Sequence, residues 1–189
     1  MVAIAVVGHL ARSDGDFSLN DMPGGAGRMD ILCRCVNASF FLSHDLRRDA
    51  ECYLILEGPP CPPKTVLIRG SEVRYLNPDE RSAGSLIKKA LDAPCGDEFR
   101  ESTRGVHVRK GGLGRLLAEH SFSVLDEAGE DIRAAGELPE AVLLSDHQNF
   151  PEKEMELIRN LPKYSVGPRS LHADHAITIL LNEIDRRSV

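Results

Sequence analysis

Three clusters of small and polar residues follow short apolar runs in the last third of the chain. They are "VLDEAGED" around Leu125, "LLSDHQNF" around Leu144, and "VGPRSLHADHA", which begins at Val166. If the runs are parallel strands, their carboxyl ends meet at one edge of a sheet, where α/β proteins bind ligands. The third cluster leads into a helix whose N-terminal N–H groups suit a carboxylate. Because this part of the chain is acidic overall, the clusters predict a site for a neutral or cation-bearing ligand rather than a nucleoside triphosphate.

Two groups of side chains within these clusters contain the residue types of catalytic or metal sites. His172, Asp174 and His175 include two imidazoles that could share a helix face, but no nearby third and fourth ligand completes a zinc shell. The consecutive residues of "SDH", 145–147, cannot form a hydrolytic triad among themselves, since base and nucleophile approach from different elements. We therefore assign no metal to the chain, and we interpret "SDH" as a turn at a strand end. The dinucleotide and triphosphate fingerprints are absent from the sequence as well.

A second chemical signal is the basic segment "RGVHVRKGGLGR", residues 104–115, which contains no acid. The net charge of −6 does not exclude a nucleic acid, because charge must be read by position. Residues 1–115 hold 16 basic against 15 acidic side chains, whereas residues 116–189 hold 7 against 14. Two interpretations stay open, a solvated loop and a phosphate-binding loop. The second would make Arg109 and Lys110 substrate-binding residues.

A third signal is a polar stripe on an apolar helix. Residues 26–42 predict a helix with apolar side chains on most faces, and Asp30, Arg34 and Asn37 interrupt them. Spacings of four and three place these side chains on one face, with Arg28 near the first turn. The stripe is consistent with an Asp30–Arg34 pair in a buried helix. It is also consistent with a helix that packs on its own subunit and faces a partner subunit or RNA.

The elements that must position these residues alternate along the chain. Six runs bounded mostly by Gly, Pro, Asp or Asn predict strands, "VAIAVVGH", "CYLILEG", "TVLIRG", "FSVLDE", "AVLLSDH" and "YSVG". Five segments predict helices, 26–42, 78–91, 112–120, 151–159 and 171–187, and Asn77 would cap the second with Pro78 at its first position. Several strands are apolar on both faces. The pattern predicts an α/β fold with a mostly parallel sheet flanked by helices.

Length and composition limit the possible protein classes. With 189 residues, 42% of them hydrophobic, the chain predicts a single domain. No apolar run approaches the roughly 20 residues of a membrane span, and the first residues lack the features of a signal peptide, so we expect a cytoplasmic protein with no membrane contact. The five cysteines predict reduced core thiols. In a monomer Phe40, Phe41 and neighbouring aliphatics would form a large exposed patch, which predicts a homodimer.

Longer blocks of the sequence resemble one known family. They are "DFSLNDMPGGAGRMDILCRCVNASFFLSHDLRRD", "LNPDERSAGSLIKKAL", "GEDIR", "SDH" and "SLHADHAITILLNEIDRR", in order from about Asp16 to Arg187. These blocks resemble the archaeal tRNA (pseudouridine N1)-methyltransferases, which belong to the SPOUT class of knotted methyltransferases. The resemblance implies a C-terminal trefoil knot at about residues 120–189, S-adenosyl-L-methionine as methyl donor, and a homodimer. It also implies tRNA as the partner, with methylation of N1 of a pseudouridine in its T-loop.

The resemblance places the donor at the three strand ends found above. The cofactor-binding residues that it implies are Leu125, Ser145, Val166, Gly167, Pro168, Arg169, Ser170, Leu171 and Ala176. Ser145 departs from the usual Gly of the family, and Ala176 stands where many members have Cys, which argues against a covalent mechanism. Arg28 and Asp30 become the catalytic candidates that place the uridine. Asp30 is also our candidate acceptor for the proton that leaves N1.

Two alternative functions stay open at this stage. The same loops would serve a methyltransferase that acts on a ribosomal RNA pseudouridine or another RNA base. A noncatalytic RNA-binding adaptor that keeps the knotted fold is the second alternative, and the departures at Ser145 and Ala176 make it conceivable.

Overall fold

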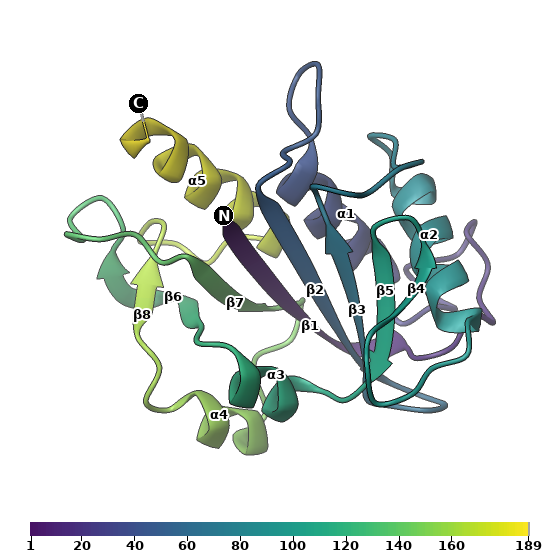
Figure 1. Cartoon of the computed structure of the whole chain (residues 1–189). Helices are drawn as coiled ribbons and strands as arrows, with labels where there is room; N and C mark the ends of the chain where they lie inside the picture. Colours follow the sequence, from purple (N-terminus) through teal and green to yellow (C-terminus); the bar gives the residue numbers. More distant parts are fainter. Residues whose placement is uncertain (189) are drawn as a thin grey trace.

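The computed structural model describes residues 1–188 as one eight-stranded sheet with five helices (Figure 1). The strands are β1 Val2–Arg12, β2 Ala50–Gly58, β3 Lys64–Arg69, β4 Arg100–Thr103, β5 Val106–Lys110, β6 Ser123–Asp131, β7 Ala141–Ser145 and β8 Lys163–Ser165. The helices are α1 Met29–Phe40, α2 Glu80–Asp92, α3 Leu113–Glu119, α4 Glu152–Ile158 and α5 Ala173–Arg187. All six predicted strands and all five predicted helices are present.

The sheet has a parallel half and an antiparallel half. Its strand order is β4-β5-β3-β2-β1-β7-β6-β8. The pairs β2–β1, β1–β7, β7–β6 and β6–β8 are parallel, and the pairs that join β3, β5 and β4 to this half are antiparallel. The predicted α/β fold with a mostly parallel sheet is confirmed. The parallel half brings the carboxyl ends of β1, β7, β6 and β8 to one edge.

The helices cover the two faces of the sheet unequally. Alternation along β1 sends Ile4 and Val6 into one core, together with residues of α1, α2 and α5. It sends Ala5 and Val7 into a second, smaller core with residues of α3 and α4. Figure 1 shows α3 and α4 close together below the sheet. The second core therefore lies beside the edge at which the parallel strands end.

Helix α1 packs closely against β1. A Cβ at Gly8 would come within 2.8 Å of the Leu32 side chain, so glycine permits this approach. Gly27 has a φ of 64° and a Cβ there would lie 1.8 Å from the Leu10 carbonyl oxygen, so only glycine fits. Phe40 is fully buried within the chain. Our argument for a homodimer from an exposed Phe40 was therefore wrong, because one chain buries this side chain by itself.

Two local predictions need correction. Helix α2 is capped by Asp79, whose side chain accepts a hydrogen bond from the Ser82 N–H at 2.8 Å, and not by Asn77. The expected basic loop at 104–115 contains strand β5, which pairs with β3 and β4.

Among the described residues, no helix is both long and apolar enough to cross a membrane. Cys33, Cys35 and Cys52 are buried free thiols, and burial raises the pKa of each.

Candidate functional site

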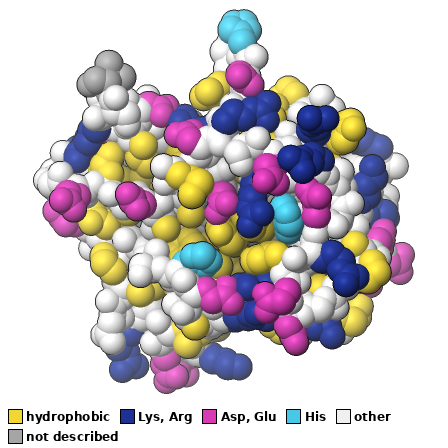
Figure 2. All heavy atoms as spheres, viewed as in Figure 1, with side chains coloured by type: hydrophobic (Ala, Val, Ile, Leu, Met, Phe, Trp, Pro, Cys, Tyr) yellow, Lys and Arg dark blue, Asp and Glu magenta, His cyan; other side chains and the backbone are white. Residues whose placement is uncertain are grey.

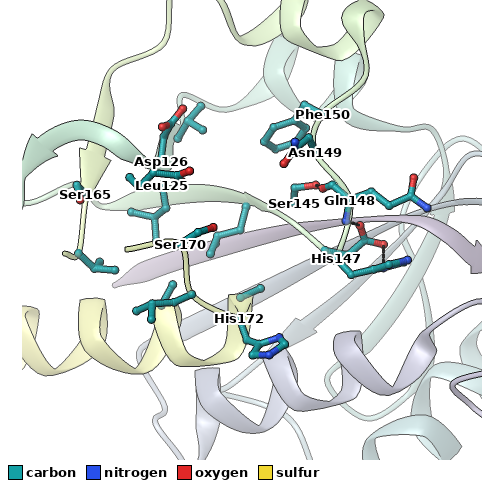
Figure 3. Close-up of a pocket in the computed structure, with 18 of the residues that line it drawn as sticks. Leu125, Asp126, Ser145, His147, Gln148, Asn149, Phe150, Ser165, Ser170 and His172 are labelled. Carbon is teal, nitrogen blue, oxygen red and sulfur yellow. Dashed lines mark hydrogen bonds and ion pairs between the residues drawn. The ribbon is translucent and has the colours of Figure 1, made fainter. Parts of the chain in front are cut away.

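An open cleft of about 720 Å³ lies at the edge where the parallel strands end. Its volume falls in the range of roughly 300–1,000 Å³ that is usual for small-molecule sites. The residues that line it come from three segments and α4: Val124–Glu127, Leu144–Phe150, Ser165–Gly167, Arg169–Ala173, Met155, Ile158 and Ala176. Figure 3 shows side chains of these segments, among them Leu125, Phe150 and Ser170, arranged around one space.

The three segments reach the cleft for different structural reasons. Strand β7 ends at Ser145, and its following loop turns over the edge of the sheet. Strand β6 does not end near Leu125 as predicted, but its register with β8 shifts between Leu125 and Glu130, which frees the backbone there. Strand β8 ends at Ser165, whose hydroxyl donates to the Gly167 carbonyl oxygen at 2.7 Å and accepts from the Gly167 N–H at 3.2 Å. These features bring residues of all three segments to the wall of the cleft.

The structure brings together eight of the nine expected cofactor residues. Leu125, Ser145, Val166, Gly167, Arg169, Ser170, Leu171 and Ala176 all line the cleft. Pro168 lies in the same loop but does not line it. The Ser145 hydroxyl donates to the Gln148 carbonyl oxygen across the turn, so this side chain is held by its own loop. The structure thus brings the expected residues to one cleft, and their role in binding a methyl donor stays a prediction.

The electrostatic character of the cleft agrees with the predicted type of ligand. Asp126, Glu127 and Asp146 line it, against one guanidinium, that of Arg169. Asp126 accepts from Lys163 at 2.8 Å, and this hydrogen bond is the main cause of its lowered pKa. Glu127 is exposed. The cleft therefore lacks the excess of positive charge that a polyphosphate would require, which agrees with a neutral or cation-bearing ligand.

The polar stripe of α1 forms an ion-pair network that extends toward the start of α5. Asp30, which is 4% exposed, accepts two hydrogen bonds from Arg28 at 3.1 Å and one from Arg34 at 3.0 Å. Arg34 also lies 3.8 Å from Asp174 in the first turn of α5. The two residues that precede Asp174 in the chain, His172 and Ala173, line the cleft. The expected Asp30–Arg34 pair is confirmed, and the network lies beside the cleft.

Arg28 has an unusual backbone. Its φ of 66° lies in the left-handed region, which a residue with a Cβ adopts at a cost of about 1–3 kcal/mol. The strained residue directs its guanidinium to both carboxylate oxygens of Asp30, and the charge of Asp146 also acts on it. Backbone strain of this kind clusters at functional sites. The geometry supports the choice of Arg28 as a site residue.

The protonation state of Asp30 does not suit a proton acceptor. Burial raises the pKa of this carboxyl, but the hydrogen bonds from Arg28 and Arg34 lower it more, so that the pKa lies below its ordinary value. A carboxylate with a lowered pKa that already accepts from two guanidinium groups is a weak base. The arrangement makes Asp30 a holder of Arg28 and Arg34 rather than a base.

The two predicted substrate-binding residues differ in their surroundings. Arg109 is 3% exposed, lies on β5, and donates to both oxygens of Glu119 at 3.0 and 2.6 Å. Its guanidinium also stacks 4.2 Å from the centroid of the Phe99 ring. A phosphate cannot reach this group, so the expectation that Arg109 binds substrate conflicts with the structure. Lys110 is exposed and stays a candidate.

Figure 2 shows acidic and basic side chains intermixed over the half of the molecule that carries β3, β4 and β5. Arg115 donates to Glu119 at 3.0 Å and to Glu98 at 3.2 Å. The acid-free segment 104–115 therefore meets acidic partners in space. This half of the sheet does not form the uniformly basic surface that the sequence suggested.

Sequence reasoning missed the part of the cleft contributed by other segments. Phe150, Met155 and Ile158 line it from the loop after β7 and from α4. No motif marks them, because they are apolar residues of an ordinary short helix and its leading loop. Asp174 was considered only as a metal ligand, yet its Oδ1 is buried with no hydrogen-bond partner among the described residues. His172 and His175 pack edge to face, with ring centroids 5.7 Å apart.

Comparisons with known proteins give a consistent result. The whole chain, residues 1–189, matches the family model described as "Putative SAM-dependent RNA methyltransferase". A protein of Methanocorpusculum labreanum is 65% identical over 99% of this chain and 98% of its own length, and one of Methanospirillum hungatei is 53% identical over 99% and 97%. Both are named tRNA (pseudouridine(54)-N(1))-methyltransferase.

A solved structure resembles the fold. It is that of Archaeoglobus fulgidus Nep1 bound to S-adenosylhomocysteine, which superposes with a TM-score of 0.66, covers 100% of this chain and 99% of its own, and is 15% identical. At this identity the likeness shows a shared fold alone. The fold predicted from the sequence, that of a SPOUT-type methyltransferase, agrees with it.

Proposed function

The chain belongs to the family of SAM-dependent RNA methyltransferases, and from this premise we propose that it methylates N1 of pseudouridine 54 in tRNA. The observation that carries the proposal is the 65% identity, over 99% of the chain, to a relative named for this reaction. Similarity of this extent includes every segment that lines the cleft. The donor is S-adenosyl-L-methionine.

The residues of the cleft fit this donor. S-adenosyl-L-methionine carries a sulfonium and an amino group, and among the carboxylates of the cleft wall that of Glu127 is exposed, whereas Asp126 pairs with Lys163 and Asp146 with His9. A Cβ at Gly167 would meet no atom within 4 Å, so the loop beside it leaves open space. The small side chains of Ala173 and Ala176 border the same space. We propose that backbone groups of Leu125, Ser145 and the 166–171 loop hold the donor.

When bound, the donor supplies an electrophilic methyl group that needs little activation, so the protein must mainly align the nucleophilic nitrogen with it. We propose that the guanidinium of Arg28, whose side chain is 37% exposed, contacts the uridine. Asp30, whose side chain is 5% exposed, holds that guanidinium in place through their ion pair. Because Asp30 is a weak base, the proton of N1 passes to water rather than to this carboxylate.

The remaining assignments rest on the family resemblance. We propose that residues 1–189 form a single domain, that the part at about 120–189 is threaded as a trefoil knot, and that the enzyme works as a cytoplasmic homodimer. Leu171 and Met155, exposed by 42% and 44% beside the cleft, supply apolar surface that a second subunit could cover. Sedimentation at micromolar concentration tests the dimer, and a monomer would contradict it.

Two tRNA transcripts test the proposed substrate. One carries uridine at position 54 and the other pseudouridine, and both are incubated with the enzyme and donor labelled in the methyl group. We expect label in the pseudouridine transcript alone, since uridine has no N–H at the position of N1. Equal labelling of both transcripts would contradict the proposal, because it would place the methyl group on another atom.

A further inference from the structure

His9 lies just behind the wall of the cleft and contacts two of its segments. It does not line the cleft itself. Its backbone N–H donates to Asp146 Oδ2 at 3.0 Å, and its Nδ1 lies 3.0 Å from Asp146 Oδ1. Its Nε2 lies 2.9 Å from Glu154 Oε2, and its ring meets the Phe150 ring edge to face at a centroid distance of 6.2 Å.

These contacts define the charge of the ring. Both ring nitrogens face a carboxylate oxygen, and an ionised carboxylate only accepts hydrogen bonds. A neutral imidazole has one N–H, so both contacts require the doubly protonated form. The three side chains are 9%, 1% and 12% exposed for His9, Asp146 and Glu154, so little water competes with the pairs. Burial lowers the pKa of His9, but the hydrogen bonds with the two carboxylates raise it more, to about 9.

The two carboxylates belong to different parts of the cleft wall. Asp146 is in the 145–150 loop, and it also accepts from the Gln148 N–H at 2.9 Å, which closes the turn. Glu154 is on α4, whose Met155 and Ile158 line the cleft. The side chain of His9 thus bridges the loop after β7 and helix α4, because it contacts a carboxylate of each.

We propose that His9 is a positioning residue for the donor site, whose imidazolium holds the 145–150 loop and helix α4 at the spacing that S-adenosyl-L-methionine requires. The inference rests on the proposed function of the cleft. Strand alternation explains why His9 can act there, because it lies on the same face of β1 as Ala5 and Val7, the face that packs toward α4.

The bridge makes donor binding sensitive to alkaline pH. Three further charged or titratable groups lie around the bridge besides Asp146 and Glu154. Glu57 is at the end of β2, where burial and then the charge of Glu154 raise its pKa, and the charge of Arg28 acts on Asp146. The Nδ1 of His147 lies 3.3 Å from Asp146 Oδ2. The folded pKa of His9 lies above its ordinary value of 6.5. The contribution of the bridge is therefore complete below about pH 6.5 and is lost as pH rises through about 9.

Calorimetric titration of the full chain with S-adenosyl-L-methionine tests the inference. We expect Glu154→Gln, which removes one charge-assisted contact, and His9→Gln, which removes both, each to weaken binding at least about tenfold at pH 7.5. Matched controls are His44→Gln in an exposed loop and Glu156→Gln on the exposed side of α4, which should bind within about twofold of wild type. Circular dichroism melting curves show which variants are folded.

The pH profile separates a positioning role from a merely structural one. Between pH 7 and 10 the affinity of wild type should approach that of His9→Gln, because the wild-type ring loses its second proton, and titration of the donor itself affects both proteins equally. A folded His9→Gln with wild-type affinity, or a tenfold difference that persists at pH 10, would overturn the inference. If His9→Gln does not fold, wild-type affinity in Glu154→Gln overturns it instead. A wild-type chain that does not bind the donor would overturn the proposed function itself, which distinguishes the two failures.

Discussion

Replacing Gly167 by valine tests whether the donor occupies the cleft. Gly167 lines the cleft, and a Cβ there meets no atom within 4 Å. Its φ lies outside the left-handed region, so the backbone tolerates a side chain. The valine would extend into space that the folded chain leaves open. We therefore expect the free energy of unfolding to change by less than about 0.5 kcal/mol.

Donor binding should respond differently. A bound S-adenosyl-L-methionine would meet the new methyl groups, and forcing extra methyl groups into a filled space typically costs about 1–3 kcal/mol. Such a cost raises the Kd about 5- to 150-fold. Calorimetric titration measures the Kd, and denaturant unfolding measures stability on the same samples.

A second glycine supplies the control for this prediction. Gly136 is exposed in the β6–β7 connection, its Cβ would also meet no atom within 4 Å, and it does not line the cleft. Gly136→Val should therefore bind the donor as wild type does. If Gly167→Val also bound with unchanged affinity, the donor would not lie against the 166–171 loop, and our placement of the site would be refuted.

The remaining predictions concern the charged residues. Asp30→Asn should lower kcat at least about tenfold and change the donor Kd less than about threefold, since it releases Arg28 without touching the cleft; an unchanged kcat would contradict this. Because the pKa of Asp30 is lowered in the folded protein, its contribution to the free energy of unfolding is complete above about pH 4 and is lost as pH falls through that lowered pKa. The difference in the free energy of unfolding between Asp30→Asn and wild type, measured with denaturant, should therefore shrink in acid. Arg109→Ala should destabilise the fold by about 1–3 kcal/mol, because it removes a buried guanidinium that donates two hydrogen bonds to Glu119 and stacks on Phe99, and a wild-type melting curve would count against these contacts. Lys110→Ala should leave the fold intact and reduce the salt slope of tRNA binding by roughly 1, and an unaltered slope would show that this lysine is only solvated.

The position of the cleft was predictable because it depends on topology. Parallel strands place their carboxyl ends at one edge, so three polar clusters after three apolar runs had to meet once the sheet was parallel. Leu125, Ser145 and Val166 lie more than 15 residues apart in sequence, yet all line one cleft. The strand ends account for Ser145 and Val166, whereas Leu125 reaches the cleft where the register of β6 with β8 shifts.

The basic segment misled the prediction because its acidic partners lie near it in space but outside the segment itself. In "VHVRK" the alternation of Val106 and Val108 toward the core is the signal of a strand, and charged residues at the intervening positions obscured it. Burial of Arg109 depends on Glu119, which lies ten residues away and on another element. A count of basic residues cannot contain that information.

The bridge formed by His9 was beyond the reach of sequence reasoning. Its partners Asp146 and Glu154 lie 137 and 145 residues farther along the chain. A single histidine at the end of a strand carries no pattern of its own. Only the pairing of β1 with β7, and the packing of α4 on the same face, brings the three groups within hydrogen-bonding distance.

Mass spectrometry of the methylated tRNA tests the central claim most directly. A transcript with pseudouridine at position 54 is incubated with enzyme and donor, digested to nucleosides, and compared with authentic 1-methylpseudouridine, while nuclease fragments locate the modified position. We predict one 1-methylpseudouridine per tRNA, at position 54. A methyl group on the ribose, on another base or at another position would contradict the account, even if the donor binds in the cleft as proposed.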